Sequence, residues 1–266
     1  MIIASDLDRT LMYSRRALDE LGHSRETKLK PVERKDGSWV GYMTETAFSD
    51  LKKLSRESLF IPVTTRTTEQ FKRFVIFESE VSLPYAITSN GANILYKGNP
   101  LKEWSENLSS QMAHEVLGLD EFLSTLLKEG YCFDGQLKKV EKLFFYFILN
   151  GLPSSFEQRG IRALAASYGW RLSLQGRKLY FIPKLISKGN ALEFICEREG
   201  MEAFAGAGDS VLDWDFLQKC RYSFVPKHGE LKEHVDASLI TLTNKLGIAA
   251  GEEILKNIRA SLLMKS

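Results

Sequence analysis

The sequence has few cysteines, no long apolar run and almost no net charge. Its three cysteines, Cys132, Cys196 and Cys220, are far apart and form no CxxC pair. This odd, scattered set argues against a disulfide framework or a cysteine zinc site and fits a reducing compartment. A net charge of +2 gives no indication of a nucleic-acid partner or an anionic membrane surface.

The apolar segments are all shorter than a membrane span. The run at residues 143–149, LFFYFIL, has the length of a strand. The N-terminus enters a strand pattern at once and lacks the basic and apolar regions of a signal peptide. We therefore expect a soluble, cytoplasmic protein whose 266 residues form one large domain or two modest ones.

The first ten residues, MIIASDLDRT, combine a short buried strand with two carboxylates. Asp6 and Asp8 are two positions apart, so in an extended chain both side chains reach the same side. Two like charges at this separation repel unless a cation lies between them. The stretch therefore indicates a magnesium site with a reactive carboxylate, and an acidic turn after a strand is the alternative.

Strand and helix patterns alternate over the first 92 residues. After the first strand the pattern predicts a helix from Thr44, a strand at 59–63, a helix from about Glu69 and a strand at 84–88. The last two strands end in the polar segments TTRT and SNGA, although Pro62 counts against a central position for the first of these. This is the layout of an open α/β sheet whose ligand site lies beyond the carboxyl ends of its strands.

The connection after Thr10 is too long for a tight strand-to-helix turn. Residues 28–34 and 38–43 flank Lys35-Asp36-Gly37, and Asp-Gly is a strong hairpin signal. We expect a β-hairpin flap near residues 28–43, beside the active end of the first strand. A disordered basic loop over residues 14–35 is the alternative.

The pattern changes between about residues 93 and 183. The predicted elements there are helices at 105–117 and 119–129, strands at 131–135 and 142–149, a helix at 154–168, and strands at 170–174 and 178–182. They predict an antiparallel sheet with helices on one face, with the aromatic run 144–147 in its core. We therefore expect an α/β protein in which a Rossmann-like core, residues 1–92 and 184–266, carries an inserted α+β cap domain, residues 93–183.

The core pattern resumes with SKGN at residues 187–190 and GDSVLD at 208–213. Phosphoryl transfer to a carboxylate needs a nucleophile, an acid, a metal and donors for the phosphoryl oxygens. Asp6 would attack phosphorus, and Asp8 would protonate the leaving oxygen and later activate water. Thr64 and Lys188 supply a hydroxyl and an ammonium, and Asp6 and Asp209 supply oxygen ligands for magnesium.

In this order, the motifs DLDRT, TTR, SNGA, SKG and GDSVLD resemble the haloacid dehalogenase-like superfamily of phosphohydrolases. The resemblance is to its Cof-like type IIB branch with a C2 cap, which includes sucrose-phosphate and mannosylglycerate-phosphate phosphatases, and it covers nearly the whole chain. It implies a magnesium-dependent phosphomonoesterase for a small phosphorylated metabolite, a sugar phosphate above all, with an aspartyl-phosphate intermediate. By this analogy the catalytic residues are Asp6, Asp8, Thr64 and Lys188.

The resemblance also implies a metal site. Asp6, the Asp8 backbone carbonyl and Asp209 would bind magnesium, and Asp213 would orient the lysine or a metal-bound water. The sequence departs from the branch at Leu212, where an asparagine is usual, and this puts part of the metal's surroundings in doubt.

The expected substrate contacts are Thr65, Arg66 and Asn90. Thr65 replaces the glycine that the branch usually has, and its side chain would narrow the phosphate pocket. Arg66 and Asn90 lie at strand ends, where they either touch substrate or tie the two domains together. The four histidines form no ligand pair, and we interpret them as surface or packing residues.

Three other functions remain open from the sequence. A phosphomutase would use the same chemistry and transfer phosphate without net release. A nucleotide-sugar transferase would use Asp6-Leu7-Asp8 as its metal-binding pair, but this leaves Thr64, Lys188 and Asp209 unexplained. A non-catalytic phospho-ligand binding protein would not need both Asp6 and Asp8.

Overall fold

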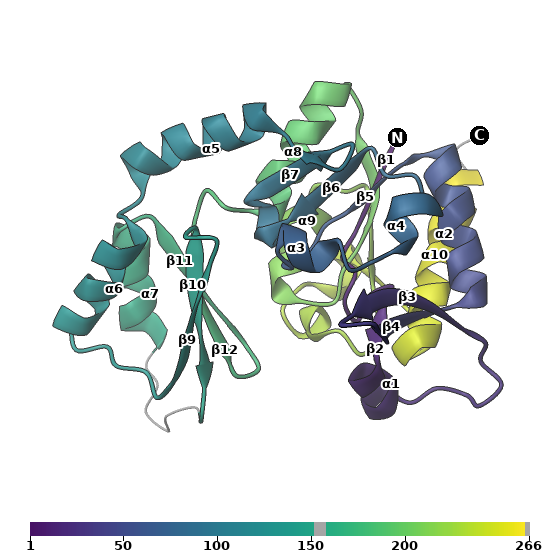
Figure 1. Ribbon diagram of the computed structural model, residues 1–266, viewed down its shortest axis with the longest axis horizontal. Helices are drawn as coiled ribbons and strands as arrows, with labels where there is room; N and C mark the ends of the chain where they lie inside the picture. Colours follow the sequence, from purple (N-terminus) through teal and green to yellow (C-terminus); the bar gives the residue numbers. More distant parts are fainter. Residues whose placement is uncertain (152–157, 264–266) are drawn as a thin grey trace. The chain divides into compact units, whose positions relative to one another are not determined.

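The computed structural model describes residues 1–151 and 158–263, which fall into two compact units (Figure 1). The first unit is Met1–Leu101 with Lys188–Ser266, and the second is Lys102–Ser187. These bounds differ from the insertion predicted at 93–183, because residues 184–187 fall in the second unit and residues 93–101 in the first. Strand β7 (Asn93–Tyr96) pairs there with β6 (Tyr85–Thr88).

A five-stranded parallel sheet forms the centre of the first unit. Its strand order is β15 (Thr241–Leu242), β14 (Tyr222–Val225), β13 (Ala203–Ala207), β1 (Ile2–Ser5) and β5 (Leu59–Pro62). The chain leaves β1 toward β5 and later returns to its other side at β13. In open α/β sheets, ligands bind at the carboxyl ends of the strands where the order reverses in this way. The predicted α/β fold class is confirmed.

The central strands are apolar on both faces because helices cover the sheet on both sides. All residues of β1 and β13 are buried, which explains their continuous small and apolar sequences, IIAS and AFAGA. Pro62 does not interrupt β5, since it is the strand's last residue. The next amide, Val63 N–H, donates to the Ser5 carbonyl at 2.7 Å, so the proline ring nitrogen faces away from β1.

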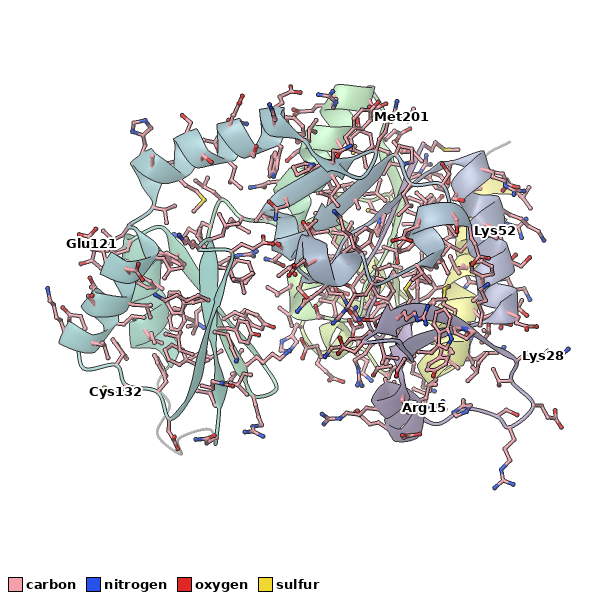
Figure 2. The ribbon with its side chains drawn as sticks, in the orientation of Figure 1. Arg15, Lys28, Lys52, Glu121, Cys132 and Met201 are labelled. Carbon is pink, nitrogen blue, oxygen red and sulfur yellow. The ribbon has the colours of Figure 1, made fainter. Side chains whose placement is uncertain are left out.

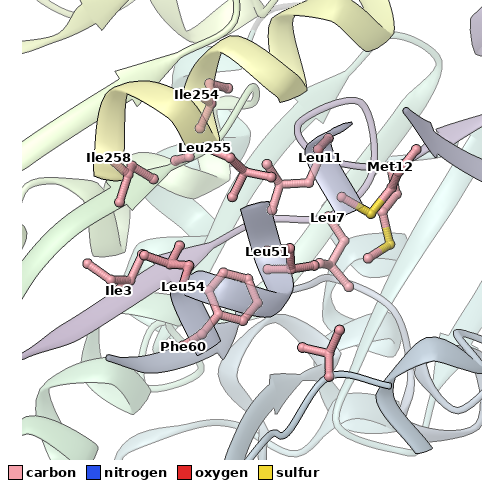
Figure 3. Packing of buried hydrophobic residues seen from close by; sticks show 14 of the residues in the cluster. Ile3, Leu7, Leu11, Met12, Leu51, Leu54, Phe60, Ile254, Leu255 and Ile258 are labelled. Carbon is pink, nitrogen blue, oxygen red and sulfur yellow. The ribbon is translucent and has the colours of Figure 1, made fainter. Parts of the chain in front are cut away.

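Helices α2 (Glu45–Glu57) and α10 (Gly247–Leu263) lie side by side on one face of this sheet, and Figure 1 shows α8 (Lys188–Glu199) and α9 (Trp214–Leu217) on the other. Figure 3 shows the core under α2 and α10. Its members include Ile3, Phe60, Leu51, Leu54, Ile254, Leu255 and Ile258. Thr44 caps α2 as predicted, because its hydroxyl accepts from Ala47 N–H at 3.0 Å.

The hairpin predicted at 28–43 is present as β3 (Leu29–Lys35) and β4 (Ser38–Thr44). Asp36 and Gly37 both have positive φ, 48° and 80°. A two-residue hairpin turn whose twist matches that of its strands needs positive φ at both positions. A short strand β2 (Tyr13–Ser14) joins β4, and α1 (Arg15–Leu21) follows, so a disordered loop over 14–35 is wrong. Arg15 and Lys28 are exposed (Figure 2).

The remaining elements of the first unit are short. They are α3 (Thr68–Phe71), α4 (Ile76–Ser79), β8 (Asn99–Pro100), and the 3-10 helices η1 (Ser89–Gly91), η2 (Val211–Asp213), η3 (Glu230–Glu233) and η4 (Ala237–Leu239). The single helix predicted from Glu69 is therefore two helices of one turn each. Strands β6, β7 and β8 form a small antiparallel sheet, which a parallel bridge between Val63 and Ile87 links to β5.

The second unit is a four-stranded antiparallel sheet with helices. Its elements are α5 (Lys102–Glu115), α6 (Leu119–Lys128), β9 (Gly135–Val140), β10 (Phe144–Leu149), α7 (Gln158–Ser167), β11 (Trp170–Gln175) and β12 (Lys178–Pro183). Phe145 stacks on Phe181 and Phe122 of α6 on Trp170, so the aromatic run contributes to the core as predicted. The strand predicted at 131–135 lies instead at 135–140, where pairing with β10 defines it. The predicted helix at 154–168 begins outside the described residues.

Among the described residues, no helix is both long enough and apolar enough to cross a membrane.

Helix α10 packs directly against the loop that follows β1. A Cβ added at Gly251 would lie 2.8 Å from the Thr10 carbonyl oxygen and 3.3 Å from Leu11 Cα. We expect Gly251→Ala to lower the free energy of unfolding by about 1–3 kcal/mol, because backbone would have to move. Chemical denaturation tests this, with exposed Lys256→Ala on the same helix as the control. An increase in stability from helix propensity alone would contradict the close packing.

Candidate active site

Polar side chains from four segments meet at the carboxyl edge of the central sheet. Asp6 directly follows β1, Thr64 follows β5, and Asp209 follows β13 after one glycine. Lys188 is the first residue of α8. Parallel strands end at the same edge, so residues far apart in the sequence come together here. The residues grouped from the sequence for phosphoryl transfer thus lie at one end of one sheet.

Lys188 is a fully buried cation between two carboxylates. Its Nζ lies 2.6 Å from Asp213 Oδ1 and 3.1 Å from Asp6 Oδ1, and the residue is 0% exposed. Burial alone would lower the pKa of Lys188, but Asp213 and Asp6 more than offset this and raise the pKa above its ordinary value. The ammonium therefore stays charged and holds Asp6 in place.

Asp213 uses both of its oxygens inside the protein. Oδ1 accepts from Lys188, while Oδ2 accepts from the backbone N–H groups of Asp209 and Ser210 and from the Ser210 hydroxyl, at 2.9–3.0 Å. A Cβ at Gly208 would lie 2.5 Å from Asp213 Cβ, which explains the glycine before Asp209. These bonds favour the lysine-orienting role expected for Asp213 over a direct metal contact.

Asp6, Asp209 and Asp213 form a cluster that is able to hold a metal ion. Each offers a carboxylate oxygen, and the three oxygens lie within 4.8 Å of one another. Lys188 bonds to two of these carboxylates, and Arg9 Nε lies 4.0 Å from Asp209 Oδ2, so three ionised carboxylates still exceed the two neighbouring cations by one charge. Oxygen donors with this charge suit a hard divalent cation.

Burial and neighbouring carboxylates raise the pKa of two members of this cluster. Burial raises the pKa of Asp6 to about 7; Lys188 opposes this shift, and Asp213 and Asp8 add to it. Burial, together with Asp6 and Asp213, raises the pKa of Asp209 well above its ordinary value. A bound cation would favour the ionised form of both carboxylates and reverse these shifts.

The Asp8 side chain is bonded to a different cation from the one that Asp6 contacts. Both oxygens of Asp8 accept from Arg66, whose Nε and Nη2 each lie 2.6 Å away. On its other side, Arg66 donates to both oxygens of Glu33 at 2.6 and 3.0 Å. Burial would lower the pKa of Arg66, but bonds to Asp8 and Glu33 outweigh it and raise the pKa. Arg66 therefore ties Asp8 to the hairpin, all within the first unit.

Thr64 and Asn90 lie next to each other behind this pair. Thr64 is buried, its hydroxyl accepts from Arg66 N–H at 3.1 Å, and its carbonyl accepts from Asn90 N–H at 3.0 Å. Asn90 is 0% exposed and left-handed, with φ 60°. Neither Nδ2 nor Oδ1 of Asn90 finds a hydrogen-bond partner among the described residues. Each such atom costs about 1–3 kcal/mol, so this amide indicates a ligand-binding position. Thr65 is partly exposed in the turn between Thr64 and Arg66.

Two residues near the site carried no recognisable signal in the sequence. Glu33 is one of several charged residues in the hairpin, and such side chains are usually solvated. His228, interpreted as a surface or packing residue, bonds through Nε2 to the Arg9 carbonyl at 2.8 Å. Its Nδ1 accepts from Gly247 N–H, so in the neutral ring Nε2 is the donor. Burial lowers the pKa of His228 and favours this neutral form. His228 thus fixes the backbone directly after Asp8.

The structure also contains a cavity of about 750 Å³. It is lined by residues from the end of α2, from α3 and α4, and from β7 and the turn after it. None of the carboxylates at the sheet edge lines it. The cavity is therefore not the place where the predicted chemistry would occur.

No family model and no curated protein matches the chain. Solved structures do match along nearly its whole length. A sucrose-phosphatase from Synechocystis sp. PCC6803, in complex with sucrose and phosphate, aligns with a TM-score of 0.66 and 15% identity, over 97% of this chain and 98% of that one.

Two further structures agree. A haloacid dehalogenase-like hydrolase protein from Bacillus subtilis has a TM-score of 0.54 and 15% identity, over 97% of this chain and 89% of that one. A phosphatase of the haloalkanoate enzyme superfamily from Bacteroides thetaiotaomicron has a TM-score of 0.54 and 12% identity, over 97% and 94%. At these identities the similarity concerns the fold. The chain has the haloacid dehalogenase-like hydrolase fold.

Proposed function

We propose that this protein is a magnesium-dependent phosphomonoesterase that acts on a small phosphorylated metabolite, with sugar phosphates as the expected class. The observation that carries the proposal is the buried Lys188 ammonium bonded to Asp6 and Asp213, beside a carboxylate cluster with uncompensated charge. The fold shared with the sucrose-phosphatase, which was seen with sucrose and phosphate, supports the substrate class.

In the first step, a carboxylate oxygen of Asp6 attacks phosphorus, and the bond from phosphorus to the ester oxygen breaks. Asp8 gives its proton to that leaving oxygen, so an alcohol departs and Asp6 carries the phosphoryl group. Lys188 fixes the attacking carboxylate through the 3.1 Å bond to Asp6 Oδ1. Thr64 and Asn90 supply neutral donors for the phosphoryl oxygens, which adds no charge to an anionic group.

In the second step, Asp8 accepts a proton from a water molecule that attacks the phosphoryl group on Asp6. The acyl-phosphate bond breaks, inorganic phosphate leaves, and Asp6 is regenerated as a carboxylate. Asp8 ends with its proton restored, so the cycle balances. Asp6 and Asp8 have separate partners, Lys188 and Arg66, so each carboxylate is held independently of the other.

Asp6 and Asp209, together with the Asp8 carbonyl, would hold the metal. When bound, a magnesium ion would neutralise charge on the phosphoryl oxygens and on the attacking carboxylate. Asp213 would act on the site through Lys188 and through the backbone of Asp209.

Replacement of the nucleophile tests the reaction. With magnesium, we expect the protein to release phosphate from para-nitrophenyl phosphate, and Asp6→Asn to lower the rate by roughly a thousandfold or more, because an amide does not attack phosphorus. Phosphate release is the measurement. Asp19→Asn is the matched control, because Asp19 is an exposed residue of α1. Activity that survives Asp6→Asn would sink the proposal. Transfer between two positions of one sugar without release would instead identify a phosphomutase.

The raised pKa of Asp6 predicts how magnesium affects stability. Its folded-state pKa of about 7 exceeds the unfolded value, so its contribution to stability is present below the unfolded pKa and is lost as pH rises through 7. Magnesium binds the ionised carboxylate. We therefore expect it to raise the Tm by several degrees at about pH 8 and by less at about pH 5.5.

Thermal unfolding with and without the ion measures this effect. Asp209→Asn should remove the magnesium shift at both pH values, while Asp19→Asn should keep it. An equal shift in the Asp209→Asn protein would contradict the assigned ligands.

The unpartnered amide of Asn90 predicts opposite effects on activity and stability. Asn90→Gly keeps the left-handed backbone and removes two buried polar atoms. We expect kcat/KM to fall about tenfold or more, because a phosphoryl donor is lost, while the free energy of unfolding stays equal or rises. Kinetics and denaturation on the same preparation measure both. Lower stability with unchanged kcat/KM would show that Asn90 is a structural residue.

A further inference from the structure

Glu33 is a buried charge in a hairpin, and the two side chains that follow it are exposed. Glu33 is 3% exposed, whereas Arg34 and Lys35 are exposed to solvent. Val32, directly before it, is also buried and belongs to the main core. Neighbouring residues of a regular strand face opposite sides, and the pairing of β3 with β4 shifts on both sides of Glu33. Such an irregularity redirects a side chain, here away from solvent.

The facing strand leaves room for this carboxylate. Glu33 pairs with Gly41, and a Cβ added there would lie 2.8 Å from Glu33 Cβ and 2.9 Å from Oε2. The backbone also fastens β3 to the segment after α3, because Arg34 N–H donates to the Arg73 carbonyl at 2.9 Å. Glu33 is therefore held between β4 and the turn that contains Arg73.

Glu33 meets two arginines, and one of them continues to Asp8. Arg73 Nη2 lies 3.0 Å from Glu33 Oε1, while Arg66 makes the two-bond contact with Glu33. The Arg66 guanidinium also lies over the Phe74 ring, 4.2 Å from its centroid. Phe74 fixes the plane of the Arg66 guanidinium group, and Glu33 binds one of its edges. The other edge therefore faces Asp8 in a fixed direction.

Asp8 itself has little else to fix it. Its side chain is 44% exposed, so without a partner the carboxylate would rotate freely among its rotamers. The pair of 2.6 Å bonds from Arg66 selects one direction. A catalytic acid must lie within hydrogen-bond reach of the oxygen that it protonates, and fixing its direction in advance removes part of the barrier.

We propose that Glu33 is a positioning residue that fixes Arg66 and, through it, the direction of the Asp8 carboxylate. This inference rests on the proposed phosphatase function, in which Asp8 protonates the leaving oxygen. Glu33 itself contacts neither substrate nor the reacting atoms. The hairpin β3–β4 thus acts on one defined event, the transfer of a proton to the departing alcohol.

This role has a chemical signature that a general loss of structure lacks. An alkyl phosphate releases a strongly basic alkoxide, so cleavage depends on proton delivery. Para-nitrophenyl phosphate releases a stable phenolate, so its cleavage depends much less on proton delivery. Since kcat/KM reports the steps up to the first irreversible one, misplacing Asp8 should lower it far more for the alkyl ester.

The experiment compares glycerol phosphate with para-nitrophenyl phosphate as substrates of the whole 266-residue chain. We expect Glu33→Gln to lower kcat/KM for glycerol phosphate by about tenfold more than for the aryl ester. Gly41→Ala should give the same pattern, because its methyl group displaces the Glu33 carboxylate without changing any charge. Glu80→Gln is the matched control, since it removes another ion pair of the hairpin, Lys30–Glu80, which does not reach Asp8.

The outcomes separate this inference from the function on which it rests. The positioning role would be overturned if Glu33→Gln and Gly41→Ala lowered kcat/KM equally for the two esters. It would also be overturned if Glu80→Gln gave the same selective loss for glycerol phosphate. In both cases the phosphatase activity itself would stand. If Glu33→Gln does not fold by circular dichroism, Gly41→Ala decides alone. If the unaltered protein shows no phosphate release that depends on Asp6, both proposals are overturned.

Discussion

The buried contact of Lys188 with Asp6 and Asp213 is the constraint on which the candidate site depends. An ammonium with no exposed surface is tolerated only where carboxylates compensate it, and removing one partner of such a pair typically costs about 3–5 kcal/mol. This contact joins the end of β1, the start of α8 and the loop after β13. The three segments therefore have to assemble together, and the carboxylate cluster assembles with them.

Charge divides the site into two parts with different partners. Asp6, Asp209 and Asp213 have Lys188 and the more distant Arg9 as cations and remain negative, whereas Asp8 and Glu33 are matched by Arg66 and Arg73. The first part can accept a cation, and the second is already neutral. Two carboxylates two residues apart thus lie in different electrostatic environments.

Sequence reasoning recovered the groups that follow buried strands, because an apolar run that ends in Asp6, Thr64 or Asp209 is visible in the order of residues alone. It missed what depends on pairing between strands. The burial of Glu33 comes from a register shift in β3, and the assignment of residues 93–101 to the first unit comes from the pairing of β7 with β6. It also could not show how the four hydrogen bonds to Asp213 are distributed.

The second unit begins directly after Leu101 and ends at Ser187, which is the residue before Lys188. Exchange of residues 102–187 between relatives would leave the segments with Asp6, Thr64 and Asp209 intact. Its first splice point is remote from them in sequence, whereas its second adjoins the buried ammonium. Recombination of this domain is therefore restricted at one junction, where the new segment must rejoin the chain without shifting the first turn of α8.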